Sequence, residues 1–129
     1  RALIEQGGDA IEGPFDGEEA ITLMADLQAG ATGSMTSAMI PDQIKPVIEH
    51  FLAAGKADQA ASAYARVLPA INFENRQCGF RATKVVMEEG GVIQSAFCRH
   101  PIPALHPQTK AGLLEILRPL NPVALNWGK

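Results

Sequence analysis

The stretch Gly30-Ala31-Thr32-Gly33-Ser34-Met35-Thr36-Ser37, with the helix that follows it, decides the fold class of this 129-residue chain. Residues 31–37 predict a short strand of small and hydroxyl-bearing side chains. Pro41 then begins a helix that ends at Gly55. The apolar positions of this helix recur at i, i+3, i+4, i+7 and i+8: Ile44, Val47, Ile48, Phe51 and Leu52. A strand joined to an amphipathic helix by a short connection is typical of an α/β fold.

The residues before this stretch show the same order of elements. Residues 9–13 predict a first strand, and a helix is expected over 16–29, where Asp16 and Glu19 fit a capping box. The order strand, helix, strand, helix favours parallel pairing with right-handed crossovers. Two parallel strands leave faces and edges open, so the pattern requires more strands than the chain supplies. By itself such an incomplete sheet is expected to aggregate, swap domains or bind a partner chain.

The second half of the chain is predicted to be helical. One helix is capped by Asp58, carries Tyr64 on an alanine-rich inward face, and is kinked or broken at Pro69. Further helices are expected over 80–89 and 108–117, on either side of a proline-rich connection. Tyr64 is the single tyrosine, and its place on the alanine stripe indicates a core residue rather than a proton relay.

The composition excludes several classes of protein. With 47% hydrophobic and 19% charged residues, the chain is a globular domain, and a net charge of −3 excludes a strongly basic nucleic-acid binder. No apolar run approaches the roughly 18 residues that span a bilayer. Two cysteines make no disulfide framework and the first residues lack signal-peptide features, so we expect a cytoplasmic protein.

The chain begins in what the pattern predicts to be the last turns of a helix, which Gly7 and Gly8 close. Because this helix has no N-terminal cap, we expect that residues before Arg1 are missing. The alternative is processing or truncation at a natural boundary.

Two other kinds of site find little support in the residue spacing. The histidines and cysteines match no pair of zinc ligands, so structural or exposed histidines and buried free cysteines are expected: His50, His100, His106, Cys78 and Cys98. The segment around Gly33 lacks the spacing and the lysine of a phosphate-binding loop. The acidic residues before 20 are expected to form a solvated helix start. No metal and no cofactor is predicted.

Four motifs follow one another in an order that is specific in combination. Residues 30–37 with the proline-led helix precede the stretch Ala54-Gly55-Lys56-Ala57-Asp58-Gln59-Ala60. Residues 84–91 fit a Lys-x-x-hydrophobic-x-x-x-Gly helix, and Arg99-His100-Pro101 with Pro103 and Leu105 fits an Arg-x-Pro-x-x-Pro segment. Ile11-Glu12-Gly13 stands where a seventh strand would carry Ser-Gly or Asn-Gly. Over nearly the whole chain, these motifs resemble the dihydrodipicolinate synthase / N-acetylneuraminate lyase superfamily.

This resemblance implies the C-terminal part of a (β/α)8 TIM barrel, with its last two βα units in residues 1–55 and three C-terminal helices in residues 56–129. Enzymes of the family are commonly homotetramers and are lyases that form a Schiff base between a lysine and a 2-oxo acid. The protonated imine is an electron sink, which eases proton removal or bond cleavage beside the former carbonyl. The implied partner is a small 2-oxo acid, with no nucleic acid and no membrane.

Two segments depart from the synthase pattern and resemble the sugar-acid branch of the family: residues 12–17 and residues 33–37. The resemblance therefore implies dehydration of a 2-keto-3-deoxy sugar acid such as 2-keto-3-deoxy-L-arabonate. Two alternatives stay open, an aldol condensation of the dihydrodipicolinate synthase type and a non-catalytic helical interaction module. The module is favoured if residues 9–13 and 31–37 do not pair in parallel.

No catalytic residue is predicted in this chain. The family's Schiff-base lysine lies on the sixth strand and its tyrosine partner on the fifth, and the chain is expected to start after both. Among the five lysines, Lys84 alone shares an apolar face, with Phe80 and Met87, and we expect it to reach solvent or pair with an acid. The chain alone is therefore predicted to be inactive.

Five residues match substrate-binding positions of the family. By resemblance, Gly13 leaves space beside the imine, Met35 lies beside the catalytic lysine, and Ser37 contacts the sugar part of the substrate, with Thr36 as a neighbouring hydroxyl. Glu12 replaces a small polar residue and is a candidate to orient a substrate hydroxyl, assist proton transfer or pair with a basic side chain. The alternative for each residue is packing or turn geometry.

Overall fold

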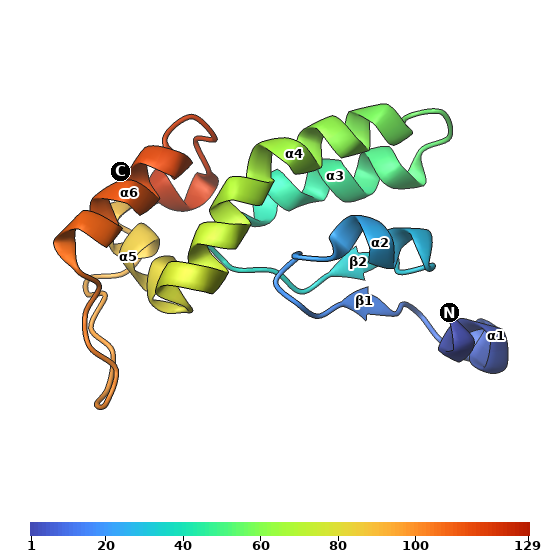
Figure 1. The fold of residues 1–129 in the computed structure, drawn as a ribbon, viewed down its shortest axis with the longest axis horizontal. Helices are drawn as coiled ribbons and strands as arrows, with labels where there is room; N and C mark the ends of the chain where they lie inside the picture. Colours follow the sequence, from blue (N-terminus) through green and yellow to red (C-terminus); the bar gives the residue numbers. More distant parts are fainter.

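Two short strands, β1 (Phe15–Asp16) and β2 (Gly33–Ser34), form a parallel pair in the computed structural model, which describes residues 1–129 (Figure 1). Phe15 pairs with Gly33 and Asp16 with Ser34. Two further backbone bonds extend the ladder, from Thr32 N–H to the Pro14 carbonyl (2.9 Å) and from Met35 N–H to the Asp16 carbonyl (2.7 Å). A parallel pair with helix α2 (Leu23–Gln28) between its strands in sequence is therefore present, as the order of elements predicted, but it joins residues 15–16 to 33–34 and not residues 9–13 to 31–37.

The first strand does not lie where the sequence predicted it. Helix α1 (Ala2–Gly7) is followed by a 3-10 turn, η1 (Gly8–Ala10), so the prediction of a strand over 9–13 is wrong. Gly13 has a φ of 125°, a conformation that glycine adopts without steric cost, and the chain turns there before β1 begins at Phe15. The second strand lies inside the predicted 31–37 but is only two residues long.

The helix expected over 16–29 is limited to Leu23–Gln28. Asp16 is not its cap, because it lies in β1 and is buried rather than solvated. The Asp16 carboxylate accepts hydrogen bonds from the backbone N–H groups of Glu18 (3.4 Å) and Ala20 (3.1 Å). Glu19 and Ala20 have φ values of 55° and 66°, so a left-handed turn stands in place of the first helical turns.

Helices α3 (Pro41–Leu52) and α4 (Ala57–Phe73) form an antiparallel pair (Figure 1). The predicted start of α3 at Pro41 is confirmed, whereas Asp58 lies in the first turn of α4 and not at its cap. The helix does not break at Pro69 but continues into a π-helical turn, η2 (Glu74–Cys78). Val67, Ala70 and Ile71 are buried around the proline, and their burial outweighs the missing proline N–H.

Helices α5 (Arg81–Glu89) and α6 (Pro107–Leu117) agree closely with the predicted ranges and are followed by a 3-10 turn, η3 (Val123–Leu125). Lys110 of α6 pairs with Glu88 and Glu89 of α5, at 3.8 and 3.7 Å. Gly90 lies against η3, where an added Cβ would be 1.8 Å from the Ala124 carbonyl oxygen. The connection between α5 and α6 extends away from the helices (Figure 1).

One apolar core joins the sheet side of the molecule to the helical side. Its largest fully buried aliphatic and methionine side chains come from α2, the segment after β2, and helices α3 to α6: Leu23, Met39, Ile40, Val47, Val67, Ile71, Val86, Leu113 and Leu117. This core places the end of β2 directly against η2 and α5. No helix has both the length and the apolar character needed to cross a membrane.

Candidate functional site at the carboxyl end of β2

The five predicted substrate-binding residues fall at opposite ends of the parallel pair. Glu12 and Gly13 precede β1, whereas Met35, Thr36 and Ser37 follow β2. Since the strands run in the same direction, the first two lie at their amino ends and the last three at their carboxyl ends. Thr36 and Ser37 line one cavity, whereas Met35, Glu12 and Gly13 do not line it. The Glu12 side chain is exposed and makes no hydrogen bond or ion pair.

The glycine at the carboxyl end of β1 is Gly17, which the sequence argument did not single out. A Cβ at Gly17 would lie 3.3 Å from the Met35 Cε atom, so the absence of a side chain leaves room for this methionine. Gly17 directly follows Asp16 in the sequence, but the first strand was predicted earlier in the chain, at residues 9–13, so Gly17 was not placed at its carboxyl end. Met35 is 61% exposed at this end of the sheet.

A polar cavity of about 340 Å³ lies beyond Ser37, between the carboxyl end of β2, η2 and the start of α5. Eight polar residues or glycines and one phenylalanine line it: Glu19, Thr36, Ser37, Glu74, Asn75, Gly79, Phe80, Thr83 and Lys84. Hydroxyl, carboxyl and amide groups therefore converge on this space. Such a set suits a small polar ligand.

Ser37, Thr83 and Glu74 are linked by hydrogen bonds at the base of this cavity. The Ser37 Oγ and Thr83 Oγ1 atoms are 2.6 Å apart, and Thr83 Oγ1 lies 3.2 Å from Glu74 Oε1. Ser37 Oγ also accepts a hydrogen bond from the Met39 N–H at 3.2 Å. Ser37 and Glu74 are both buried, and the two bonds that involve Thr83 are partly buried. Sequence reasoning named Ser37 but missed Glu74 and Thr83, which no local pattern marks.

Glu74 is only 5% exposed. Burial raises the pKa of Glu74, the neighbouring Ser37 and Thr83 hydroxyls oppose that rise, and the negative charge of Glu19 adds to it. A carboxyl with a raised pKa inside a polar cavity is a feature that functional sites share with some structural networks.

Two more polar groups complete the cavity. The Thr36 Oγ1 atom is shielded from solvent and has no hydrogen-bond partner in the protein, so it is free to bond a ligand. The Lys84 Nζ atom donates a hydrogen bond to the Phe97 carbonyl oxygen. Of the two expectations for Lys84, reaching solvent or pairing with an acid, the second is not met: its head lies at an exposed position, where the connection after α5 supplies a backbone acceptor.

Tyr64 lies outside this cavity. Its hydroxyl is directed at two backbone carbonyl oxygens, those of Ala20 (2.9 Å) and Ile21 (2.6 Å). Burial raises the pKa of Tyr64, and the negative charges of Asp16 and Asp26 add to the effect. A tyrosine held in its neutral form against carbonyl oxygens connects α4 to the turn after β1, in agreement with its predicted structural role.

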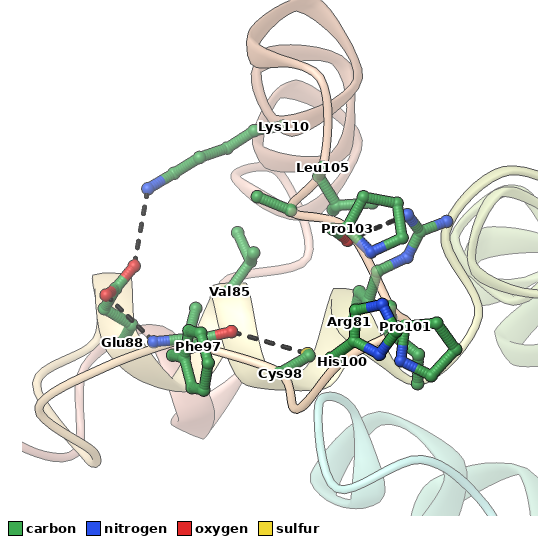
Figure 2. Close-up of a pocket in the computed structure, with 13 residues that line it drawn as sticks. Arg81, Val85, Glu88, Phe97, Cys98, His100, Pro101, Pro103, Leu105 and Lys110 are labelled. Atoms are coloured by element: carbon green, nitrogen blue, oxygen red, sulfur yellow. Dashed lines mark hydrogen bonds and ion pairs between the residues drawn. The ribbon is translucent and has the colours of Figure 1, made fainter.

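A larger cavity, of about 670 Å³, lies between α5, α6 and their connection (Figure 2). Its charged side chains are already engaged, since Lys110 pairs with Glu88 and the Arg81 Nη1 atom donates to the Pro103 carbonyl oxygen at 3.2 Å. Figure 2 shows these two contacts on opposite sides of Val85. The remaining lining is largely apolar and proline-rich, so this cavity offers no convergent reactive groups.

The cysteines and histidines form no cluster. No group of three His, Cys, Asp or Glu side chains is placed to hold a metal ion. Cys78 is buried, and burial raises the pKa of its thiol, an effect that Arg81 opposes and Glu74 reinforces. The His106 Nδ1 atom accepts a hydrogen bond from the Gln108 N–H and so caps α6.

Comparisons with known proteins give a matching family model and two similar proteins. The model of the dihydrodipicolinate synthetase family matches residues 13–119. Over 127 residues the chain is 57% identical to an L-2-keto-3-deoxyarabonate dehydratase of Azospirillum brasilense, covering 98% of this chain and 41% of that enzyme. A dihydrodipicolinate synthase from Rhodopseudomonas palustris has a similar fold, with a TM-score of 0.79 and 24% identity over 91% of this chain and 39% of that one. The chain thus spans about two fifths of the length of these two proteins.

Proposed function

This chain belongs to the dihydrodipicolinate synthetase family, and we propose that it forms the C-terminal part of a lyase that dehydrates a 2-keto-3-deoxy sugar acid, such as 2-keto-3-deoxy-L-arabonate. In this proposal, residues 1–55 supply the last two βα units of a (β/α)8 barrel and residues 56–129 the helices that follow. The Schiff-base lysine and its tyrosine partner lie outside the chain. The whole enzyme is a homo-oligomer, as the resemblance to the family implies.

The observation that carries this proposal is the 57% identity to an L-2-keto-3-deoxyarabonate dehydratase over almost the entire chain. The structure supports it in two ways. Residues 9–13 do not pair with 31–37, but residues 15–16, further along the chain, pair in parallel with 33–34, and this pairing supports the lyase rather than the helical module. The hydroxyl-rich cavity also lies at the carboxyl end of β2, the end at which barrel enzymes bind their substrates.

The residues of this chain would bind and orient the substrate, while the imine carries the bond-breaking step. A lysine imine withdraws electrons from the neighbouring carbon, so a proton leaves that carbon and a hydroxyl leaves as water from the next. Met35 and Gly17 line the open end of the sheet, and Ser37 and Thr36 present oxygens to the substrate's hydroxyl groups. Lys84 takes no part in the imine, since its Nζ atom is bonded to the Phe97 carbonyl oxygen.

Borohydride trapping tests the proposal. The polypeptide that joins this chain to the preceding βα units is incubated with 2-keto-3-deoxy-L-arabonate, reduced, digested and analysed by mass spectrometry. We expect one stable adduct, on a lysine outside residues 1–129, and none when the 129-residue chain is treated alone. An adduct on Lys84 that disappears in Lys84→Ala would overturn the proposal.

Product analysis in the same reaction separates the two lyase chemistries. Dehydration gives a product that keeps every carbon of the substrate and has lost one water. Retro-aldol cleavage instead releases pyruvate and a short aldehyde. We expect the dehydrated product, and pyruvate as the main product would favour the aldolase alternative.

A further inference from the structure

We propose that the hydrogen-bonded set Glu74–Thr83–Ser37 holds Ser37 as an acceptor for a hydroxyl group of the substrate, with Glu74 and Thr83 as positioning residues. The inference rests on the proposed function and names the part of the substrate that this cavity takes. That part is the neutral, hydroxylated tail of the sugar acid, and not its carboxylate end.

When Glu74 is ionised, the number of hydrogens in the set fixes its direction. Each hydroxyl has one hydrogen to donate, and an ionised carboxylate only accepts. Thr83 Oγ1 therefore donates its hydrogen to Glu74 Oε1 (3.2 Å), and Ser37 Oγ donates its hydrogen to Thr83 Oγ1 (2.6 Å). The Met39 N–H occupies one of the two acceptor positions of Ser37 Oγ. One acceptor position of Ser37 Oγ is therefore left for a ligand, and Ser37 has no hydrogen left to donate.

This direction selects the ligand's chemistry. A group that brings its own hydrogen, such as an alcohol, can bond to Ser37, whereas a carboxylate or ketone oxygen would meet a second acceptor. The carboxyls of Glu19 and Glu74 also line the cavity and disfavour a substrate carboxylate there. Lys84, the one cationic side chain of the lining, already donates to the Phe97 carbonyl oxygen.

A second acceptor lies beside Ser37. The Thr36 Oγ1 atom is shielded from solvent and has no partner, and a hydroxyl bound to Ser37 or a neighbouring one would satisfy it. Adjacent oxygens of this kind match a chain of adjacent alcohols. The polar set at the base of the cavity is thus suited to a polyol tail, with the 2-oxo acid end directed toward Met35 and the open end of the sheet.

Thr83→Val tests the inference in the polypeptide that includes the preceding βα units. Valine has the shape of threonine but neither accepts from Ser37 nor donates to Glu74, so Ser37 loses its fixed direction. We expect kcat/KM for 2-keto-3-deoxy-L-arabonate to fall about tenfold, the effect of one hydrogen bond, and mainly through KM. Thr83→Ser restores the hydroxyl and should return KM to within about threefold of the wild type.

The selectivity between substrates provides a readout that a purely structural role would not move. Pyruvate has no alcohol for Ser37, so the ratio of borohydride trapping with the sugar acid to trapping with pyruvate should fall in Thr83→Val and recover in Thr83→Ser. An equal loss of trapping with both substrates, or an unchanged KM in a Thr83→Val enzyme that still dehydrates the sugar acid, would overturn the inference and leave the proposed function standing.

Calorimetric measurement of substrate binding distinguishes failure of this inference from failure of the proposed function. If the wild type neither dehydrates nor traps the sugar acid, the proposed function fails, and binding of 2-keto-3-deoxy-L-arabonate is then compared between Thr83→Val and Thr83→Ser. Weaker binding by the valine variant supports the inference. Equal binding by both variants, or no binding by either, refutes it. Circular dichroism of each variant confirms that the comparison is made between folded proteins.

Discussion

Glu74 couples the ionisation of a single residue to the stability of the fold. Burial raises its pKa above the ordinary value of 4.5, so the folded chain binds this proton more tightly than the unfolded chain. The resulting stabilisation is fully present below pH 4.5 and is lost as the pH rises through the folded pKa. Glu74→Gln is neutral at every pH, and its carboxamide oxygen can still accept from Thr83. We expect the difference in melting temperature, variant minus wild type, to increase as the pH rises.

Thermal unfolding of both proteins between about pH 4 and pH 8 measures this difference. Glu18→Gln is the matched control, since it removes one negative charge from an exposed side chain in the turn after β1. A difference between wild type and Glu74→Gln that stays constant over the whole pH range would contradict the assignment of Glu74 as a buried, proton-binding carboxyl.

The residues of the candidate site show how much of such a site can be predicted from the sequence alone. Ser37 and Thr36 were predicted through the resemblance to substrate-binding positions of the family, and both line the polar cavity. Glu74 and Thr83 could not be predicted, because they come from a helical region far along the chain and meet Ser37 only in the folded core. No local periodicity carries information about such a contact.

Between elements, the hydroxyl of Tyr64 is the polar link from α4 to the turn that follows β1. It is directed at the carbonyl oxygens of Ala20 and Ile21, next to two residues in left-handed conformation, Glu19 and Ala20. Tyr64→Phe keeps the ring and removes this link, leaving two partly buried carbonyls with fewer partners. We expect a loss of about 1–2 kcal/mol in the free energy of unfolding.

Urea unfolding followed by circular dichroism measures this loss, with Thr22→Val as the control. Thr22 makes its hydrogen bond to Asp26 at an exposed position, so its removal should change stability by less than about 0.5 kcal/mol. If Tyr64→Phe and Thr22→Val unfold at the same urea concentration, Tyr64 does not hold the turn.

The accuracy with which each helix or strand could be predicted depends on its length. Helices α3, α5 and α6 have several turns of regular apolar spacing, and their ranges agree closely with the predicted ones. Each strand has two residues, which is too short to show an alternation of apolar and polar side chains. Asp16 also misled the prediction, because the acceptor oxygens that cap a helix serve equally well for the turn over Glu18 and Ala20.

At the scale of the whole molecule, the helical side is closed and the sheet side is open. The core from α3 to α6 is continuous, but the sheet has only two strands, and each has an unpaired edge. Phe15 and Met35 are 58% and 61% exposed on these strands and their carboxyl end. An open strand edge beside exposed apolar side chains is a template for pairing with another chain.

The 129-residue chain expressed alone is therefore expected to self-associate through its sheet side. Size-exclusion chromatography with light scattering should show species larger than a monomer, increasing with concentration. Substituting Phe15→Ser and Met35→Ser together should shift the population toward monomer, because it removes apolar area from the open side without touching the core. Trp127→Ser is the control, since Trp127 is 75% exposed but lies in the C-terminal tail. A compact wild-type monomer, or an equal shift with Trp127→Ser, would show that the sheet side does not drive association and would weaken the case that further strands cover it in the whole protein.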